Sequence, residues 1–296
     1  MTIEAKVIEK SASVKGKVIT TFQLRYPRFI HAEFMTHRMF SRNASSSRAI
    51  PVAKIIEQIR AEPARPVHWG ANQPGMQARA ELQGQALEDA QDAWTRAAWL
   101  ATNIAEEMVE AGAHKQIVNR ILEPFAHISV IVTATEWANF FELRDHPDAQ
   151  PEIRVLAQEM RKADYFYDHA SLIGTRVLES PGNDYSKAAC WHLPYITERE
   201  RVSLADRADM LLAMSAARCA RVSYLTHDGQ EPDEAKDLAL FKRLVGSAPL
   251  HASPIEHQAC GSNNLYRVSR NFRGLVQFRE LYELGLLLAF DSPTAN

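Results

Sequence analysis

The sequence predicts an α+β fold in which an antiparallel sheet packs against several long helices. Two observations carry this prediction. Residues 4–31 are rich in β-forming residues on both sides of a turn at 14–17, which is typical of a β-hairpin. Farther along the chain, apolar residues recur at threes and fours over 79–111, which is typical of a long helix.

The other elements follow from apolar spacing and from proline and glycine. Residues 29–35 are apolar and are expected to be buried, and 63–77 form a loop by composition. Gly112 is expected to end the long helix, because glycine readily takes the left-handed conformation found there. Further helices are expected at 55–60, 114–122, 133–143, 151–168 and 232–245, and at a segment that ends near 224 after a capping box at Ser203 and Asp206.

Composition limits the class of protein. The chain has 296 residues, 46% hydrophobic and 24% charged, which fits one large or two ordinary globular domains, with 180–195 as the best candidate boundary. No apolar run approaches about 20 residues, so no membrane span is expected. A net charge of −2 argues against general nucleic-acid binding. Three widely spaced cysteines without a C-x-x-C pair indicate free thiols in the cytoplasm.

Glycine is scarce, with 12 in 296 residues. Loops that cradle phosphates need glycine, because the backbone must approach the ligand closely. The sequence contains neither G-x-G-x-x-G nor a P-loop motif. A phosphate ligand must therefore be held mainly by side chains.

Positive charge is concentrated between Arg25 and Arg48, a segment with five arginines against one acid, Glu33. Arginine forks and serine hydroxyls in this segment can donate several hydrogen bonds to phosphate oxygens. On charge alone, a solvated basic loop is the favoured interpretation.

The spacing within this segment is more specific than its charge. His37-Arg38 is followed after seven residues by Ser46, with Ser41, Asn43 and Arg48 at fixed offsets. This pattern resembles the signature of flavin-dependent thymidylate synthases. Two further blocks resemble the family. They are Asn119-Arg120 with the stretch from Trp137 to Ile153, and a block from Ser215 to His257.

The third block lies after the signature here and before it in the family, so the motif order is rotated, as in a circular permutation. The resemblance implies a single domain over 1–296, with an insert around 165–214, and an antiparallel sheet with long helices as its fold.

The resemblance also implies roles for individual residues. Arg144 is expected to polarise the uracil ring, because a cation stabilises negative charge that develops there. Substrate binding is expected from the following residues: Glu33, Ser45, Ser46, Ser47, Arg48 and Arg120, with Asn119 as an alternative to Arg120. Cofactor binding is expected from the following residues: Thr36, His37, Arg38, Asn43, Thr133, Asn139, His251 and Ser253.

Several positions depart from the family pattern. Glu33 replaces a glutamine, Ala44 replaces a glutamate, and Thr36 and Thr135 each replace an arginine. Family resemblance implies reductive methylation of dUMP to dTMP with FAD, NADPH and methylene-tetrahydrofolate, in a homotetramer that shares its active sites. No nucleophilic cysteine or serine is required.

Three alternatives remain open. One is transfer of a methyl or hydroxymethyl group to another pyrimidine nucleotide, which the changes at Glu33, Thr36 and Ala44 favour. Another is a non-catalytic protein that binds a nucleotide or RNA, although few aromatic residues accompany the arginines. The last is a metal site at His251 and His257, whose spacing fits no common zinc motif; no metal is expected.

Overall fold

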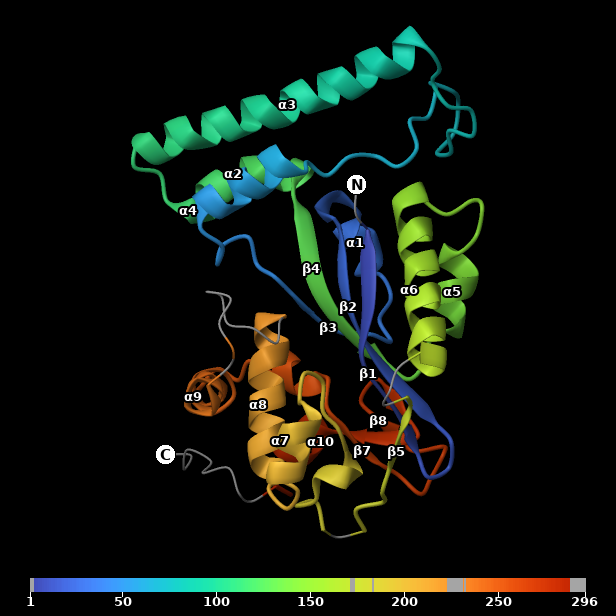
Figure 1. Ribbon diagram of the computed structural model, residues 1–296, viewed down its shortest axis with the longest axis vertical. Helices are drawn as coiled ribbons and strands as arrows, with labels where there is room; N and C mark the ends of the chain where they lie inside the picture. Colours follow the sequence, from blue (N-terminus) through green and yellow to red (C-terminus); the bar gives the residue numbers. More distant parts are fainter. Residues whose placement is uncertain (1–2, 171–173, 183, 223–230, 232, 288–296) are drawn as a thin grey trace.

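A computed structural model places residues 3–170, 174–182, 184–222, 231 and 233–287 of the chain. The fold is α+β, as predicted. A central five-stranded sheet carries a layer of helices at one end and a region of helices and short strands at the other (Figure 1).

The central sheet grows from the predicted hairpin, which consists of β1 (Glu4–Ser13) and β2 (Val18–Pro27). Its strand order is β3-β4-β2-β1-β5, with β3 at Ser41–Ala44, β4 at His127–Ala134 and β5 at Arg176–Leu178. The first three neighbouring pairs are antiparallel, whereas β5 runs parallel to β1. The signature segment therefore forms one edge of the sheet.

One face of the sheet is mostly apolar and lies against α6 (Pro151–Ala170), with Lys10 of β1 paired to Asp164 and Asp168 of the helix. Successive strand residues point to opposite faces, so Val130 and Val132 of β4 share this face. They pack in one buried cluster with Leu156 and Met160 of α6. Two shorter helices, α1 (His31–Phe34) and α5 (Ala138–Arg144), contribute Phe34 and Phe140 to the same core.

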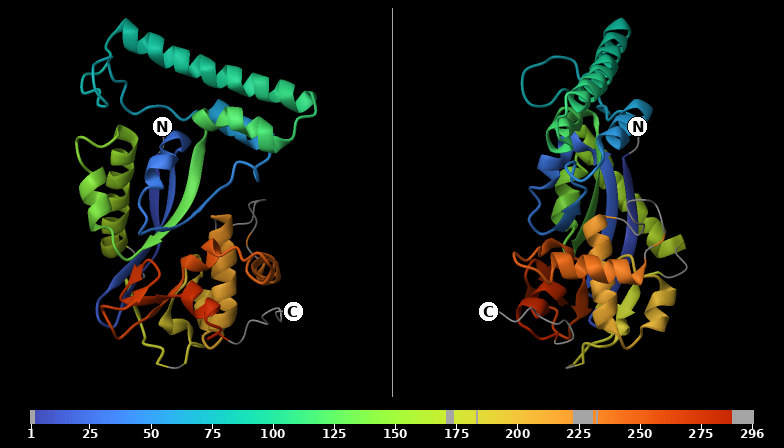
Figure 2. Two further views of the ribbon diagram at one scale, coloured as in Figure 1. Left: turned by 180° about the vertical axis from the view of Figure 1, so that it is seen from behind. Right: turned by 90° about the vertical axis from the view of Figure 1, so that its left-hand side faces the viewer.

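Three helices form a layer across the end of the sheet, as Figures 1 and 2 show. They are α2 (Val52–Ala61), α3 (Gln85–Glu110) and α4 (Lys115–Leu122), and they share a small apolar core. The long helix α3 ends where predicted, because Gly112 follows it with a φ of 84°.

The end of the opposite face that lies away from α2, α3 and α4 is covered by what we call the C-terminal region, residues 184–222 and 233–287. Its contact with the sheet includes Ile131 of β4 against Tyr195 and Cys219. The region consists of β6 (Trp191–His192), α7 (Glu198–Ser203), α8 (Ala208–Arg221), α9 (Glu234–Leu244), β7 (Ala259–Gly261), β8 (Val268–Ser269), β9 (Phe272–Arg273), β10 (Leu275–Gln277) and α10 (Phe278–Glu283). Short 3-10 turns lie at Arg28–Ile30, Glu123–Phe125, Ala188–Cys190 and Ser253–Glu256.

Three predicted helix starts were wrong. The long helix α3 begins at Gln85 rather than near Arg79, because Gly84 directly before it has a φ of 54°, in the left-handed region. Thr133 belongs to β4 because its backbone pairs with Thr21, and the helix begins only at Ala138. The capping box lies at Thr197 and Glu200, and α8 begins at Ala208 rather than after Ser203. The predicted helix end near residue 224 lies outside the described residues.

Burial of 29–35 was also only partly right. Ile30 and Phe34 are buried, whereas Phe29 and Met35 are 37% and 41% exposed. These residues form short helical turns, so only one side of the segment faces the core.

Candidate active site

Arg144 lies at the last position of α5, where its side chain meets the end of α1. Its Nε donates to His37 Nε2 at 2.9 Å, one Nη forms an ion pair with Glu33, and the other donates to Thr36 Oγ1 at 3.3 Å. These contacts use three of the five N–H groups of the guanidinium. The structure thus brings together four of the predicted residues, from positions more than 100 residues apart in the chain.

His37 is fixed by aromatic rings as well as by Arg144. Its ring stacks on Phe40 at 5.5 Å between centroids and meets the edge of Phe140 at 4.9 Å. Burial, with help from the charges of Arg144 and Arg42, lowers the pKa of His37 to about 4. The ring is therefore neutral near pH 7, which lets Nε2 accept the hydrogen bond from Arg144.

Arg42 of β3 shapes the turn between α1 and the sheet. It donates to the carbonyl oxygens of Met35 and His37, at 2.8 and 3.0 Å. Burial lowers its pKa, although electrostatic interactions with Tyr26 and Glu256 oppose the shift. Arg42 is thus a structural arginine of the signature, and Arg38 and Arg48 are the ones left for a ligand.

Arg38, Ser46 and Arg48 are exposed. Within the residues that the structure describes, no carboxylate lies within ion-pair distance of either arginine. Asn43 is half-buried on β3, where its amide donates to the carbonyl oxygen of Cys219 at 3.3 Å. The segment therefore presents two cations and a hydroxyl to solvent from the turns on either side of β3.

A second group of polar residues lies where residues 45–48 contact the end of α4. Glu123 accepts from Ser47 Oγ at 2.7 Å and pairs with Arg120 at 3.0 Å and Arg28 at 3.2 Å. Ser45 pairs with the backbone of Ser129, which anchors this end of the segment to the sheet. Arg120 is 56% exposed, so it can reach a ligand at the surface.

Asn119, the alternative to Arg120, is buried. Its amide donates to the carbonyl oxygens of Ser47 and Ile50 at 2.7 and 3.0 Å. These bonds give Asn119 a structural function, because they fix the chain that follows the signature. Arg120 keeps the exposed position beside it.

The remaining predicted residues are not gathered in one place. Asn139 is exposed on α5, and His251 and Ser253 are exposed beside the 3-10 turn Ser253–Glu256, which packs against β3. The displaced third block therefore meets the signature strand in space. Thr133 is fully buried in β4, where its hydroxyl bonds Thr21 and His257, so it is not brought to a surface ligand.

Two cavities adjoin these groups. A cavity of about 1260 Å³ is bounded by Glu33, the 66–79 loop and residues 147–158. Another, of about 580 Å³, is lined by Arg120 and by residues of α3 and α4. The first opens beside the partner of Arg144, and the second beside the exposed cation of α4.

Sequence reasoning missed Arg28 and Glu123. Glu123 stands three residues after Arg120, a spacing at which side chains on a helix meet, so this pair was detectable. Arg28 is one of the five arginines of the basic segment, but it reaches the carboxylate of Glu123 through the fold, and nothing in the sequence pairs the two.

The family model described as "Thymidylate synthase complementing protein" matches residues 3–164. The match covers more than half of the chain and includes both the signature and Arg144. The chain belongs to this family. Membership agrees with the resemblance of the first two motif blocks. The third block lies beyond the match, so the rotated motif order stays a prediction.

Solved structures of other proteins resemble part of the chain. The UMP/dUMP methylase PolB from Streptomyces cacaoi bound with 5-Br UMP has 21% identity and a TM-score of 0.44, and the match covers 55% of this chain and 88% of that one. Thymidylate synthase X from Helicobacter pylori with FAD and dUMP has 16% identity and a TM-score of 0.35, over 49% of this chain and 67% of that one. No curated protein sequence matches the chain. None of the helices in its described part is long and apolar enough to cross a membrane.

Proposed function

We propose that this member of the thymidylate synthase complementing family methylates dUMP at C5 to give dTMP. Methylene-tetrahydrofolate would donate the carbon and NADPH the reducing equivalents, with FAD as the bound cofactor. The observation that carries the proposal is Arg144, which is fixed by His37 of the signature and by Glu33, a residue that lines a large cavity. A charged group held this rigidly is suited to stabilising charge in a transition state.

Arg144 would act on the base. Two of its N–H groups are unused by His37, Glu33 and Thr36, and they can donate to a carbonyl oxygen of the uracil. Such donation would stabilise negative charge on that oxygen in the enolate form of the base, the form in which C5 can attack the donated carbon. His37 orients this arginine, because its neutral Nε2 accepts only from Arg144.

The phosphate of the nucleotide would be held by Arg48, Ser46 and Arg120. All three are exposed, and they lie on segments that Asn119 and Glu123 tie together. Ser45 and Ser47 support this group through their contacts with Ser129 and Glu123. Arginine forks and hydroxyls match phosphate oxygens without a glycine-rich loop.

The chain also has side chains that fit FAD. Arg38 has no acidic partner among the described residues and can meet a phosphate. Polar groups that can hydrogen-bond a flavin are Thr36, His37, Asn43, Asn139, His251 and Ser253. Bound flavin would supply the redox chemistry, and these residues would place it against the nucleotide.

The exposure of these residues supports a shared site. Arg38, Arg48, Asn139 and His251 all face solvent in one subunit, although ligands of this size are usually enclosed. We therefore propose a homotetramer in which neighbouring subunits close each site. The cytoplasm is the proposed location, since the three cysteines are free and buried.

The decisive experiment is tritium release from dUMP labelled at C5. Purified protein is first titrated with FAD and followed by flavin absorbance, then supplied with methylene-tetrahydrofolate and NADPH. We expect flavin binding, tritium release and dTMP. Flavin binding without release would exclude dUMP as the substrate, and no flavin binding would favour a non-catalytic nucleotide-binding protein.

A different pyrimidine nucleotide is the second candidate, and Glu33 favours it. A carboxylate only accepts hydrogen bonds, whereas the glutamine expected at this position also donates them. A cytosine base, which carries an amino group in place of one carbonyl, presents donors to such an acceptor. The same release assay with C5-labelled dCMP tests this candidate, and analysis of the product distinguishes methyl from hydroxymethyl transfer.

A further inference from the structure

The second face of the central sheet carries a row of buried polar residues. Ser41 of β3, Thr133 of β4, Thr21 of β2 and Glu9 of β1 are direct partners in the strand register. Directly opposed residues point to the same face. All four are at most 7% exposed. We call this row the polar seam.

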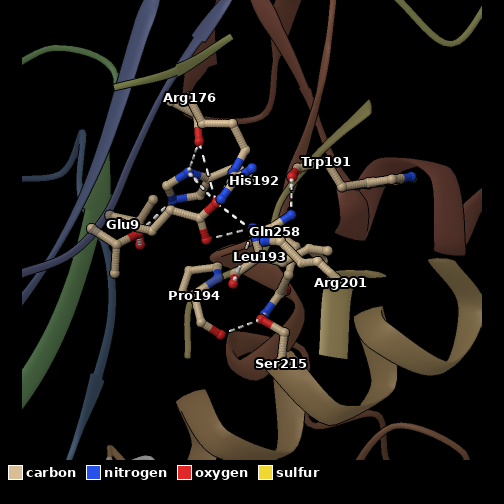
Figure 3. A network of polar contacts seen from close by, with 12 residues as sticks. Glu9, Arg176, Trp191, His192, Leu193, Pro194, Arg201, Ser215 and Gln258 are labelled. Carbon is tan, nitrogen blue, oxygen red and sulfur yellow. Dashed lines mark hydrogen bonds and ion pairs between the residues drawn. The ribbon is translucent and has the colours of Figure 1, made fainter. Parts of the chain in front are cut away.

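Each member of the polar seam bonds to the C-terminal region. Glu9 pairs with Arg201, and Thr21 bonds His192 Nε2 at 2.7 Å. Thr133 bonds His257 Nδ1 at 2.8 Å. Figure 3 shows the Glu9 end of the polar seam, where Arg201 and His192 converge.

The other end of the polar seam lies in the signature segment. Asn271 Nδ2 donates to Ser41 Oγ at 3.0 Å and to the carbonyl oxygen of Met39 at 3.1 Å. Its Oδ1 accepts from Gln277 Nε2 at 2.9 Å, and the same amide nitrogen donates to the carbonyl oxygen of Glu256 at 3.1 Å. The side-chain amide of Asn271 therefore contacts residues on both sides of Phe40, where the chain enters β3.

The hairpin that carries Asn271 holds it in a fixed position against the signature segment. It lies at the tip of the β8–β9 hairpin, directly after Arg270, whose φ of 55° is in the left-handed region. The hairpin is docked by Arg273, whose backbone N–H donates to Thr135 Oγ1 at 3.0 Å. Thr133 and Thr135 replace an asparagine and an arginine of the family pattern, and here both bond the C-terminal region.

We propose that Asn271, supported by Gln277, is a positioning residue for the signature segment. It fixes Met39 and Ser41, between Arg38 on one side and Asn43, Ser46 and Arg48 on the other. β3 is an edge strand that has a sheet partner on one side only, so this contact sets where those side chains stand. The functional part of this inference rests on the proposed function.

The structural part is tested without any ligand, by hydrogen–deuterium exchange of the full chain. Asn271→Asp keeps the size and the acceptor but removes the donor to Met39 and Ser41. Asn271→Ala removes both. We expect amides in 39–44 to exchange at least about tenfold faster in either variant. Arg270→Ala, at the same hairpin tip, is the matched control, since Arg270 pairs with Glu283 instead. Unchanged exchange in both Asn271 variants would overturn the inference.

The functional part is tested by ligand affinity at a temperature where all variants are folded. We expect the Kd of FAD or of dUMP to rise about tenfold in Asn271→Asp, with the melting temperature close to that of Arg270→Ala. Faster exchange with unchanged affinity would overturn the positioning function. Failure of the wild-type protein to bind either ligand would instead contradict the proposed function, and the exchange result would still decide whether Asn271 holds the strand.

Discussion

The two faces of the central sheet are built on different principles. The face toward α6 is mostly apolar, and Val130, Val132 and Leu156 pack there without directional contacts. Its main polar contact is Lys10 of β1, which pairs with Asp164 and Asp168 of α6. The face toward the C-terminal region carries the polar seam, in which Glu9, Thr21, Thr133 and Ser41 each need a specific partner. The four residues of the polar seam are at most 7% exposed, as buried as the apolar residues toward α6, so the difference between the two sets lies in chemistry and not in exposure.

The two faces therefore contribute differently to the stability of the fold and to the position of the site residues. Apolar packing stabilises a fold but tolerates changes of similar volume. Buried hydrogen bonds contribute less net free energy, yet each demands one geometry. The polar seam reaches the signature segment through Ser41, so we expect the polar face to specify the site and the apolar face to supply most of the stability.

Acid should produce the largest difference between the faces. Burial lowers the pKa of His192 to about 4 and that of His257 to about 3; Glu9 opposes the first shift, while Arg201 and Arg176 add to it. Below pH 6.5 these histidines become protonated in the unfolded chain but stay neutral in the folded protein. The free energy of unfolding therefore decreases as the pH is lowered. Between pH 6.5 and 4.5 the two together should lose on the order of 5 kcal/mol.

Urea denaturation at several pH values measures this loss. His257→Gln should flatten the pH dependence, while His31, His37 and His127 titrate in both proteins and drop out of the comparison. An identical slope in wild type and variant would show that the polar seam does not respond to acid.

Truncation on the apolar face should be the next largest effect. Leu156→Ala removes a fully buried side chain from the α6 contact and should lower the free energy of unfolding by about 4 kcal/mol. The affinity for nucleotide should stay unchanged in the folded protein. A loss of affinity at a temperature far below the melting transition would mean that the apolar face also positions the site.

Loss of charge at the Glu9 end of the polar seam should come third. Glu9→Gln keeps the acceptor for the backbone N–H of Leu193 but leaves Arg201, which is 6% exposed, without its charge partner. A broken buried pair of this kind costs about 3 kcal/mol. Denaturation near pH 7 checks this value, and a change below about 0.5 kcal/mol would show that the pair is not needed.

Loss of the hydroxyl at the other end should be the smallest effect on stability. Ser41→Ala removes the acceptor for Asn271 and Gln277 and should lower stability by about 1 kcal/mol. Its effect on FAD affinity should exceed that of Thr133→Val, because Thr133 lies one strand farther from the exposed residues. Equal effects would argue against a gradient along the polar seam.

Local signals in the sequence predicted much of the fold and the centre of the site. The hairpin, α3 and α6 follow from residue type and spacing, and the motif resemblance singled out Glu33, His37 and Arg144, whose grouping came only from the structure. Motifs are readable because the residues stand at short, fixed offsets.

Long-range pairing could not be predicted in this way. Thr133 lies in a strand because Thr21 and Ser41 flank it, and both are distant in sequence. Asn271 has no distinguishing local pattern, and its function depends on a hairpin docking against β4. Such partners appear only once the register of the sheet is known.

The central claim is that Arg144, as fixed by the signature, acts on the nucleotide base. Its most direct test compares C5 tritium release by Arg144→Ala and by Arg161→Ala. Arg161 is a neighbouring surface arginine that pairs with Asp145 and lies over the ring of Phe141. We predict that Arg144→Ala abolishes release while FAD still binds, and that Arg161→Ala keeps nearly wild-type turnover. Release by Arg144→Ala at the wild-type rate would contradict the account.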